Sequence, residues 1–257
     1  MNTTLLEYKN VTAGINTKTI LKNFSFKINT AGELHVIMGE NGCGKSTMSK
    51  LLVGHPTYEV KNGQLLYETE NKKIINLVEL EPPERSLLGL FLGFQSPVEI
   101  TGISNLDFLY EIYNQHATAQ NRPIYENKFD FERYLIPFLQ EVNLDQSFLY
   151  RNINEGFSGG EKKRNELLQL LLLNPKVVIL DEIDSGLDIN SMNIAANIIR
   201  KLVKNNTSII LISHYTNFIK QFKELENKLT IHIMKNGRIE RSGNLDLLHQ
   251  IEKEGFK

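Results

Sequence analysis

Residues 39–46 read Gly-Glu-Asn-Gly-Cys-Gly-Lys-Ser, which fits the pattern G-x-x-x-x-G-K-S and decides the fold class of this chain. The apolar run Glu33–Met38 before them predicts a buried strand, and Lys45–Val53 predicts a helix. Small residues between a strand and a helix N-terminus let backbone N–H groups surround phosphate oxygens. A chance glycine-rich turn would lack this strand and this helix. We therefore predict a P-loop NTPase of the α/β class, and we call residues 39–46 the phosphate loop.

The phosphate loop also predicts how a nucleotide is held. Lys45 is expected to reach the β- and γ-phosphates of ATP, and the Ser46 hydroxyl is expected to bind Mg²⁺. The predicted ATP contacts in and beside the loop are Gly39, Asn41, Gly42, Gly44, Lys45, Ser46 and Thr47.

A pair of acids follows a second apolar run. Val177–Leu180 predicts a buried strand of a parallel sheet, and Asp181 and Glu182 come directly after it. An acid at the first place can hold the Mg²⁺ shell, and the next acid can orient or deprotonate the attacking water. The alternative is a pair of solvated acids in a turn, which the apolar run and the phosphate loop argue against. We predict that Asp181 binds the metal and that Glu182 is catalytic.

Residues 157–166 read Phe-Ser-Gly-Gly-Glu-Lys-Lys-Arg-Asn-Glu, and we call them the signature segment. Ser158, Gly159 and Gly160 open a predicted helix over Ser158–Leu173, whose free N–H groups and positive end form an anion site. Taken alone, Ser-Gly-Gly is also compatible with an ordinary loop. The phosphate loop, the signature segment and the Asp-Glu pair, in that order, resemble the motifs of ABC-type ATPases.

Within that superfamily, the chain resembles the Suf-system ATPases (SufC) of iron–sulfur cluster assembly. Generic transport subunits usually carry L-S-G-G-Q, whereas Phe157 and Glu161 stand at the first and last of those places here. Other similar runs are 54–60 (GHPTYEV), 89–100 (GLFLGFQSPVEI), 181–188 (DEIDSGLD) and 213–215 (SHY).

The resemblance implies roles for residues that no local pattern would single out. Gln95 is expected to sense Mg²⁺ and the attacking water, and His214 to contact the γ-phosphate; both are expected to be catalytic, and Gln95 also a metal ligand. Ser158, Gly159 and Gly160 are expected to close on ATP held by a second copy of the chain. Asp188 belongs to a loop that crosses to that copy, which is compatible with its other reading as a helix N-cap.

Three functions remain open at this point. The first is a Mg-ATP-hydrolysing subunit of a Suf complex, with scaffold subunits of the SufB and SufD type docked on residues 97–154. The second is the ATP-binding subunit of a membrane transporter. The third is a nucleotide-gated binding module that does not hydrolyse ATP, which Lys45, Asp181, Glu182 and His214 argue against.

Composition narrows the partners and the compartment. The formal net charge of −1 gives no basic field for nucleic acid, and no apolar run approaches the ~20 residues of a membrane span. The start, Met1–Glu7, has no secretory signal pattern, so we expect no direct membrane insertion. One cysteine excludes an intrachain disulfide. The 27 asparagines and 26 isoleucines against 8 arginines suit an AT-rich genome, so we expect the plastid stroma or the bacterial cytoplasm.

We expect residues 1–257 to form one ABC-type domain with a mostly parallel core sheet, an antiparallel β subdomain and a helical insertion. Residues 1–96 and 155–257 are expected to form the catalytic core, and residues 97–154, with aromatic and leucine residues at helical spacing, the insertion. The further predicted strands and helices are Ile20–Ile28, Gly63–Glu68, Leu90–Phe94, Asn190–Val203, Ser208–Ile212 and the hairpin Leu229–Met234 with Arg238–Arg241.

Three finer expectations concern single residues. Residues 13–17 offer no aromatic side chain to stack on adenine, and Tyr8 precedes the expected place. Cys43, beside Lys45 and a helix N-terminus, is expected to have a lowered pKa. Lys163 is expected to pair with Glu182 or Asp184, the alternative being a solvated basic face or a contact with Glu166.

Overall fold

The computed structural model describes residues 4–256, and its centre is a six-stranded sheet. The strand order is β12-β11-β3-β10-β9-β6, and every neighbouring pair is parallel except β11 with β12. The strands are β3 (Leu34–Met38), β6 (Leu90–Gly93), β9 (Val177–Asp181), β10 (Ser208–Ile212), β11 (Leu229–Lys235) and β12 (Arg238–Gly243). The predicted mostly parallel core sheet is confirmed.

Both faces of this sheet are buried, which explains why its strands are apolar throughout. Alternate residues of one strand enter different clusters: Val178 and Leu180 join the first, and Val177 and Ile179 join the second. The first cluster lies against the long helices, and the second lies against an antiparallel sheet. A strand covered on both sides cannot alternate polar and apolar residues.

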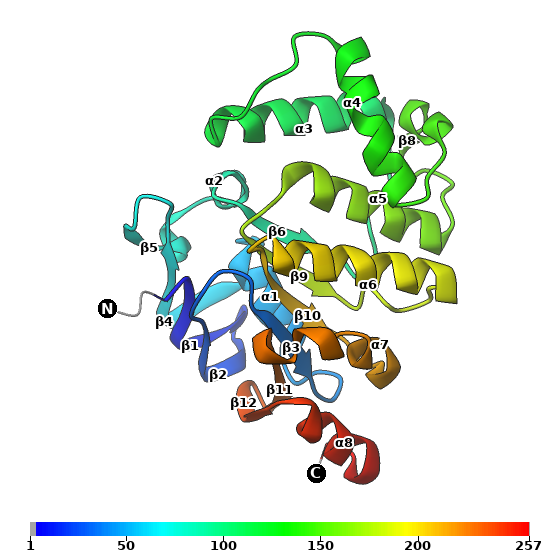
Figure 1. Cartoon of the computed structure of the whole chain (residues 1–257). Coiled ribbons are helices and arrows are strands. Elements are labelled where there is room, and N and C mark those ends of the chain that lie inside the picture. The colour runs from blue at the N-terminus through cyan, green and yellow to red at the C-terminus, as the bar shows by residue number, and fades with distance from the viewer. Residues whose placement is uncertain (1–3, 257) are drawn as a thin grey trace.

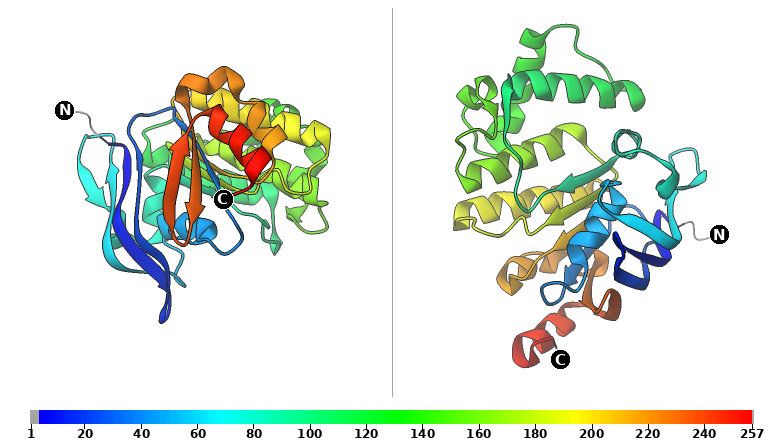
Figure 2. Two further views of the ribbon diagram at one scale, coloured as in Figure 1. Left: turned by 90° about the horizontal axis from the view of Figure 1, so that it is seen from below. Right: turned by 180° about the vertical axis from the view of Figure 1, so that it is seen from behind.

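The antiparallel sheet has the order β2-β1-β4-β5. In the view from below (Figure 2, left), the long blue strands β1 and β2 stand beside the orange strands β11 and β12. This sheet therefore covers one face of the central sheet. Its strands are β1 (Leu6–Ile15), β2 (Lys18–Ile28), β4 (Glu59–Glu68) and β5 (Ile74–Asn76).

The helices gather mainly on the other face. Figure 1 shows α3 and α4 at one end of the molecule, with α5 and α6 between them and the central strands. A short antiparallel pair, β7 (Ile100–Ser104) and β8 (Asn152–Ile153), flanks α3 and α4. The helices are α1 (Lys45–Leu52), α2 (Pro82–Leu87), α3 (Asn105–Ala119), α4 (Lys128–Glu141), α5 (Gly159–Leu173), α6 (Ile189–Lys204), α7 (Thr216–Lys220) and α8 (Leu245–Glu254), with 3₁₀ turns at Leu77–Glu79, Gln146–Tyr150 and Lys223–Lys228.

The sequence patterns missed several of these elements. Strand β1 carries Asn10 at φ 52°, and its register shifts between Tyr8 and Val11, so its apolar residues do not alternate evenly. The pair β7 and β8 was not expected inside residues 97–154. Neither were β5, α2, α7 and the C-terminal helix α8.

A chain of polar side chains is buried where the two sheets meet. His35 on β3 and His232 on β11 are 5% and 8% exposed, and both rings pack edge-on against Phe26 of β2. Nδ1 of His35 lies 3.0 Å from Nε2 of His232. At the two ends of the chain, Glu33 lies 2.9 Å from Nε2 of His35 and the Ser242 hydroxyl 2.7 Å from Nδ1 of His232. All three contacts are satisfied at once when Ser242 donates to His232, His232 to His35 and His35 to Glu33, with both rings neutral.

This arrangement predicts an acid-sensitive fold. Burial and the neighbouring His35 lower the pKa of His232 to about 3. Its pKa in the unfolded chain is about 6.5, so the unfolded chain binds the extra proton first and stability falls as the pH drops below that value. By linkage this residue alone removes about 2 kcal/mol of unfolding free energy between pH 7 and pH 5.

Urea unfolding at the two pH values measures the effect. The loss on acidification should be smaller in His232→Gln by about that amount. His249→Gln, which changes a side chain that is 61% exposed, should keep the wild-type pH dependence. Equal losses in wild type and His232→Gln would show that His232 does not carry a proton penalty.

Candidate nucleotide-binding and catalytic site

The phosphate loop connects β3 to α1 at the carboxyl edge of the central sheet. Its lysine is folded back on the loop itself: Nζ of Lys45 donates to the carbonyls of Gly39 at 2.6 Å and Glu40 at 3.1 Å. Lys45 is 5% exposed, so these carbonyls satisfy a charge that would otherwise be buried alone. Phosphate oxygens could take over the same ammonium group from these carbonyls.

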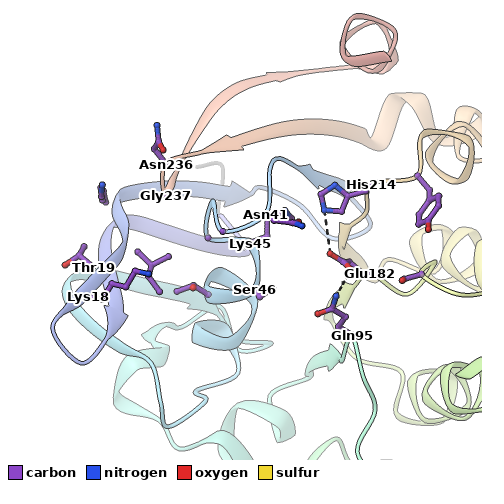
Figure 3. Close-up of a pocket in the computed structure, with 17 residues that line it drawn as sticks. Lys18, Thr19, Asn41, Lys45, Ser46, Gln95, Glu182, His214, Asn236 and Gly237 are labelled. Carbon is purple, nitrogen blue, oxygen red and sulfur yellow. Dashed lines mark hydrogen bonds and ion pairs between the residues drawn. The ribbon is translucent and has the colours of Figure 1, made fainter. Parts of the chain in front are cut away.

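A pocket of about 780 Å³ lies over this loop. Figure 3 shows Gln95, Glu182 and His214 together on one side of Lys45, with Lys18 and Thr19 on the other. The predicted site residues that line the pocket are Asn41, Gly42, Gly44, Lys45, Ser46, Thr47, Gln95, Glu182 and His214. The structure therefore brings together four segments that are far apart in the sequence.

Glu182 is aimed into the pocket by an unusual backbone. Its φ of 53° lies in the left-handed region, which a glutamate rarely adopts, and its N–H donates to the carbonyl of Ile212 at 2.9 Å. Nε2 of Gln95 donates to Oε2 of Glu182 at 2.6 Å, and Nε2 of His214 lies 3.6 Å from Oε1. Three predicted catalytic residues thus meet at one carboxylate.

His214 brings a buried ring nitrogen to the pocket near Lys45. Burial lowers its pKa, with the charge of Lys45 acting in the same direction, although Glu182 and Asp181 oppose this. Its buried Nε2 atom has no hydrogen-bond partner among the described residues. A ring nitrogen left open beside Lys45 is what a phosphate oxygen would require.

Asp181 lies beneath the phosphate loop, on the loop's serine side. Oδ2 of Asp181 accepts from the Ser49 hydroxyl at 3.4 Å, and Ser46 also bonds to this carboxylate. Burial, together with the charge of Glu182, raises the pKa of Asp181 despite these bonds. Ser46, Gln95 and Asp181 line one small cavity and offer the hydroxyl, amide and carboxylate oxygens that Mg²⁺ prefers.

These donors fit a magnesium ion that arrives with the nucleotide. Among residues 4–256 no group of three or more His, Cys, Asp or Glu side chains could hold a metal ion. A magnesium ion bound through one carboxylate and phosphate oxygens needs no such group.

The residues of the signature segment do not line the pocket. Ser158 caps α5, where its hydroxyl accepts from the N–H of Glu161 at 3.3 Å and the Glu161 carboxylate accepts from the N–H of Ser158. Asp188 caps α6 through the N–H of Ser191 at 2.8 Å. A Cβ at Gly160 would lie 3.7 Å from the Ser191 hydroxyl, so these two helix starts lie side by side. Ser158, Gly159, Gly160 and Asp188 form a separate surface.

Sequence reasoning missed the side of the pocket away from Glu182. Its lining residues are Lys18, Thr19, Ile20, Lys22, Asn236 and Gly237, whereas Ser185 and Tyr215 line the pocket on the side of Glu182 and His214. Gly237 donates to the carbonyl of Cys43 at 2.9 Å and accepts from the N–H of Lys22 at 3.2 Å. No short-range signal links a turn at residue 236 to a loop at residue 43. Tyr8, noted as the nearest aromatic residue, is fully buried and donates to the carbonyl of Met48, so it cannot stack on a base.

The predicted lowering of the Cys43 pKa is wrong. The side chain is 8% exposed, and burial raises the pKa of its thiol even though Lys45 and nearby N–H groups act in the opposite direction. Sγ lies 4.0 Å from Nζ of Lys45, too far to form a tight ion pair. At Cys43 the cost of burying a thiolate outweighs the stabilisation expected from the helix N-terminus.

The predicted pairing of Lys163 with Glu182 or Asp184 is also wrong. Nζ of Lys163 instead donates to the carbonyl of Phe94 at 2.7 Å, and the residue is 4% exposed, which excludes a solvated basic face as well. Glu182 is engaged by Gln95, and Asp184 accepts from the Ser213 hydroxyl at 2.5 Å. The sequence shows which side chains are charged, but it does not show which backbone carbonyl lies within hydrogen-bond distance of each.

Comparison with known proteins agrees with this geometry. The sequence profile of the ABC transporter family matches residues 21–185. The chain is 45% identical over 254 residues to "Probable ATP-dependent transporter ycf16" of Cyanophora paradoxa, covering 99% of this chain and 94% of that protein. It is 44% identical to "ABC transporter I family member 6, chloroplastic" of Arabidopsis thaliana, covering 98% and 72%, and 43% identical to a probable ATP-dependent transporter of Synechocystis, covering 100% and 96%.

Solved structures show the same fold at lower identity. The ATP-binding subunit of an ABC transporter superposes with a TM-score of 0.73 at 24% identity, covering 97% of this chain and 93% of that one. A nucleotide-free ATP-binding cassette gives 0.73 at 21%, covering 98% and 96%. With the family profile and the close relatives, the match establishes that the chain belongs to the ABC transporter family, as an ATP-binding domain that hydrolyses ATP.

Proposed function

We propose that this chain is the ATPase subunit of a Suf-type iron–sulfur cluster assembly complex, working in plastids. The observation that carries the ATPase part is the convergence of Lys45, Gln95, Glu182 and His214 on one pocket. The assignment to a Suf-type complex is supported by the sequence of the signature segment and by identity over nearly the whole chain to ycf16-type proteins. The plastid part is supported by the chloroplastic relative of Arabidopsis thaliana.

Two copies of the chain would share each ATP. Ser158, Gly159, Gly160 and Asp188 lie outside the pocket that holds Lys45, so a second copy is needed to add them to a bound nucleotide. A similar solved cassette is a dimeric post-hydrolysis state bound to ADP and Pi, superposing with a TM-score of 0.72 at 22% identity. Head-to-tail closure would place the signature segment of one copy over the phosphate loop of the other.

The resting contacts suggest how the chemistry begins. ATP phosphates would draw Lys45 from the carbonyls of Gly39 and Glu40, and the open Nε2 of His214 would meet the γ-phosphate. Magnesium, when bound, would neutralise phosphate charge at Ser46, Gln95 and Asp181. Glu182 would then exchange its bond to Gln95 for one to the attacking water.

A partner would dock on one part of the chain. We propose residues 1–96 and 155–257 as the catalytic core and residues 97–154 as the partner-binding region. Between them lies an apolar groove of about 390 Å³. Phe94, which lines it, is 41% exposed. In this groove Phe108, Ile112 and His116 belong to α3, and the residues of the proposed core include Pro56, Pro82 and Phe91.

The competing function is a subunit of a membrane transporter, which the names of the relatives mention. In residues 4–256 none of the helices has the length and apolar character needed to cross a bilayer. Affinity capture of the tagged chain from native extract separates the two functions. Recovery of scaffold subunits that bind iron–sulfur clusters supports the proposal, whereas stoichiometric recovery of integral membrane chains from the detergent fraction refutes it.

Replacing Glu182 by Gln should separate ATP binding from turnover. The ligands to phosphate and Mg²⁺ remain, so the dissociation constant for Mg-ATP should stay near the wild-type value while phosphate release falls by about a hundredfold or more. ATP should then trap a dimer in sedimentation experiments. Glu226→Gln, at an exposed acid far from the pocket, serves as the control. Phosphate release at the wild-type rate would remove Glu182 from the catalytic role.

Replacing Ile112 by Glu should uncouple the chain from its scaffold. A charge in place of an apolar side chain would have to lose its water when a partner covers the groove, so scaffold affinity should fall by about tenfold or more. Basal ATP hydrolysis should stay unchanged because Ile112 is remote from the pocket. The matched control is Phe129→Glu on α4, whose ring is 64% exposed and lies outside the groove. Equal loss of scaffold binding in both variants would place docking elsewhere.

A further inference from the structure

Two side chains of α5 bond to the backbone of one residue, Phe94, through its N–H and its carbonyl. The carboxylate of Glu166 accepts from the N–H of Phe94 at 2.7 Å, and Nζ of Lys163 donates to the carbonyl of Phe94 at 2.7 Å. Phe94 comes directly after β6 and directly before Gln95. The backbone at the start of the glutamine segment, residues 94–99, is therefore fixed by its donor and its acceptor at once.

The same helix also holds the far end of the glutamine segment. Lys162 forms an ion pair with Glu99 at 2.6 Å. The buried amide of Asn165 donates to Oδ1 of Asn154 at 3.0 Å, and Asn154 in turn donates to the carbonyl of Val98 at 2.8 Å. Gln95 thus lies on an arch whose two ends both rest on α5.

The glutamine segment carries a bond to the predicted catalytic residue Glu182. Nε2 of Gln95 donates to Oε2 of Glu182 at 2.6 Å, and both residues line the nucleotide pocket. Helix α5 begins at Gly159, inside the signature segment that is proposed to close on the second copy's ATP. A shift of α5 on closure would move the end of the arch that places Gln95.

The burial of these two charges calls for a reason beyond filling space. Lys163 and Glu166 are 4% and 6% exposed, and no ion pair within 4.0 Å joins them. Burial raises the pKa of Glu166 to about 7, and its Oε2 atom has no hydrogen-bond partner among the described residues. That oxygen lies against Gly93, where an added Cβ would come within 3.4 Å of it. Apolar side chains would fill the same space at lower cost.

We propose that Lys163 and Glu166 are positioning residues for Gln95, and that they link the signature helix of one copy to the catalytic carboxylate of the same copy. The inference rests on the proposed roles of Gln95 and Glu182. It gives a function to the Lys-Lys-Arg-Asn-Glu run, which touches no part of the nucleotide pocket.

The test separates the effect of side-chain shape from the effect of hydrogen bonding at Glu166. Glu166→Met keeps the length of the side chain and loses the acceptor, whereas Glu166→Gln keeps an oxygen for the N–H of Phe94. We expect kcat for ATP hydrolysis to fall by about tenfold or more in Glu166→Met and to stay within about threefold of wild type in Glu166→Gln. The dissociation constant for Mg-ATP should stay within about twofold in both, because Lys45 and Ser46 are untouched.

Two more variants complete the experiment. Lys163→Met removes the donor to the carbonyl of Phe94 and should reproduce the loss of kcat at constant affinity, even if Glu166→Met fails to fold. Gln169→Met, one turn further along α5 and on the same groove, should behave like wild type. Wild-type kcat in Glu166→Met and Lys163→Met overturns the inference, as does a parallel loss of Mg-ATP affinity or an equal loss of kcat in Gln169→Met.

A Glu182→Gln variant measured alongside keeps this inference separate from the proposed function. Hydrolysis at the wild-type rate by Glu182→Gln would refute the catalytic assignment itself. Abolished hydrolysis in Glu182→Gln with normal kcat in Glu166→Met and Lys163→Met would refute only the positioning role.

Discussion

The structure depends on how closely the phosphate loop packs against the turn between β11 and β12. A Cβ at Gly39 would lie 2.2 Å from the carbonyl oxygen of Met234, and a Cβ at Gly237 would lie 2.1 Å from that of Ile20. Only glycine allows either approach. Because Gly237 also bonds to the backbone of Cys43 and Lys22, the loop, β2 and β11 are fixed as one unit. Residues from both sides of this contact line the pocket.

The sequence predicts the strands and helices best where one physical requirement dominates. Val177–Leu180 and Ser208–Ile212 are apolar because they are covered on both faces, and both strands are confirmed. Prediction fails where a long-range backbone contact decides the outcome, as at Gly237, or where a bulge interrupts the pattern, as at Asn10. The prediction for Lys163 failed for a third reason. Its partner is a backbone carbonyl, which every residue has, so no pattern of side chains reveals it.

The excess of asparagine has a structural use that composition alone did not show. Of the eleven non-glycine residues with positive φ in the described chain, nine are asparagines. Asparagine tolerates this left-handed conformation better than other residues with a Cβ, because its short amide can bond to the nearby backbone. The remaining two are Lys72 and Glu182. Glu182 therefore stands out as the position where a strained backbone serves a side chain that is placed for chemistry.

Three charged side chains of the site each have a partner within the protein. Lys45 is bonded to loop carbonyls, Glu182 to Gln95, and Asp181 to Ser46 and Ser49. At these three side chains ATP and magnesium would exchange existing bonds for others of similar kind, whereas the open Nε2 of His214 would gain a partner. Such a site can be switched by small displacements of its ligands. The backbone before Gln95 is bonded to α5, and Gln95 is bonded to Glu182, so a displacement of α5 would bear on the bond that Glu182 makes.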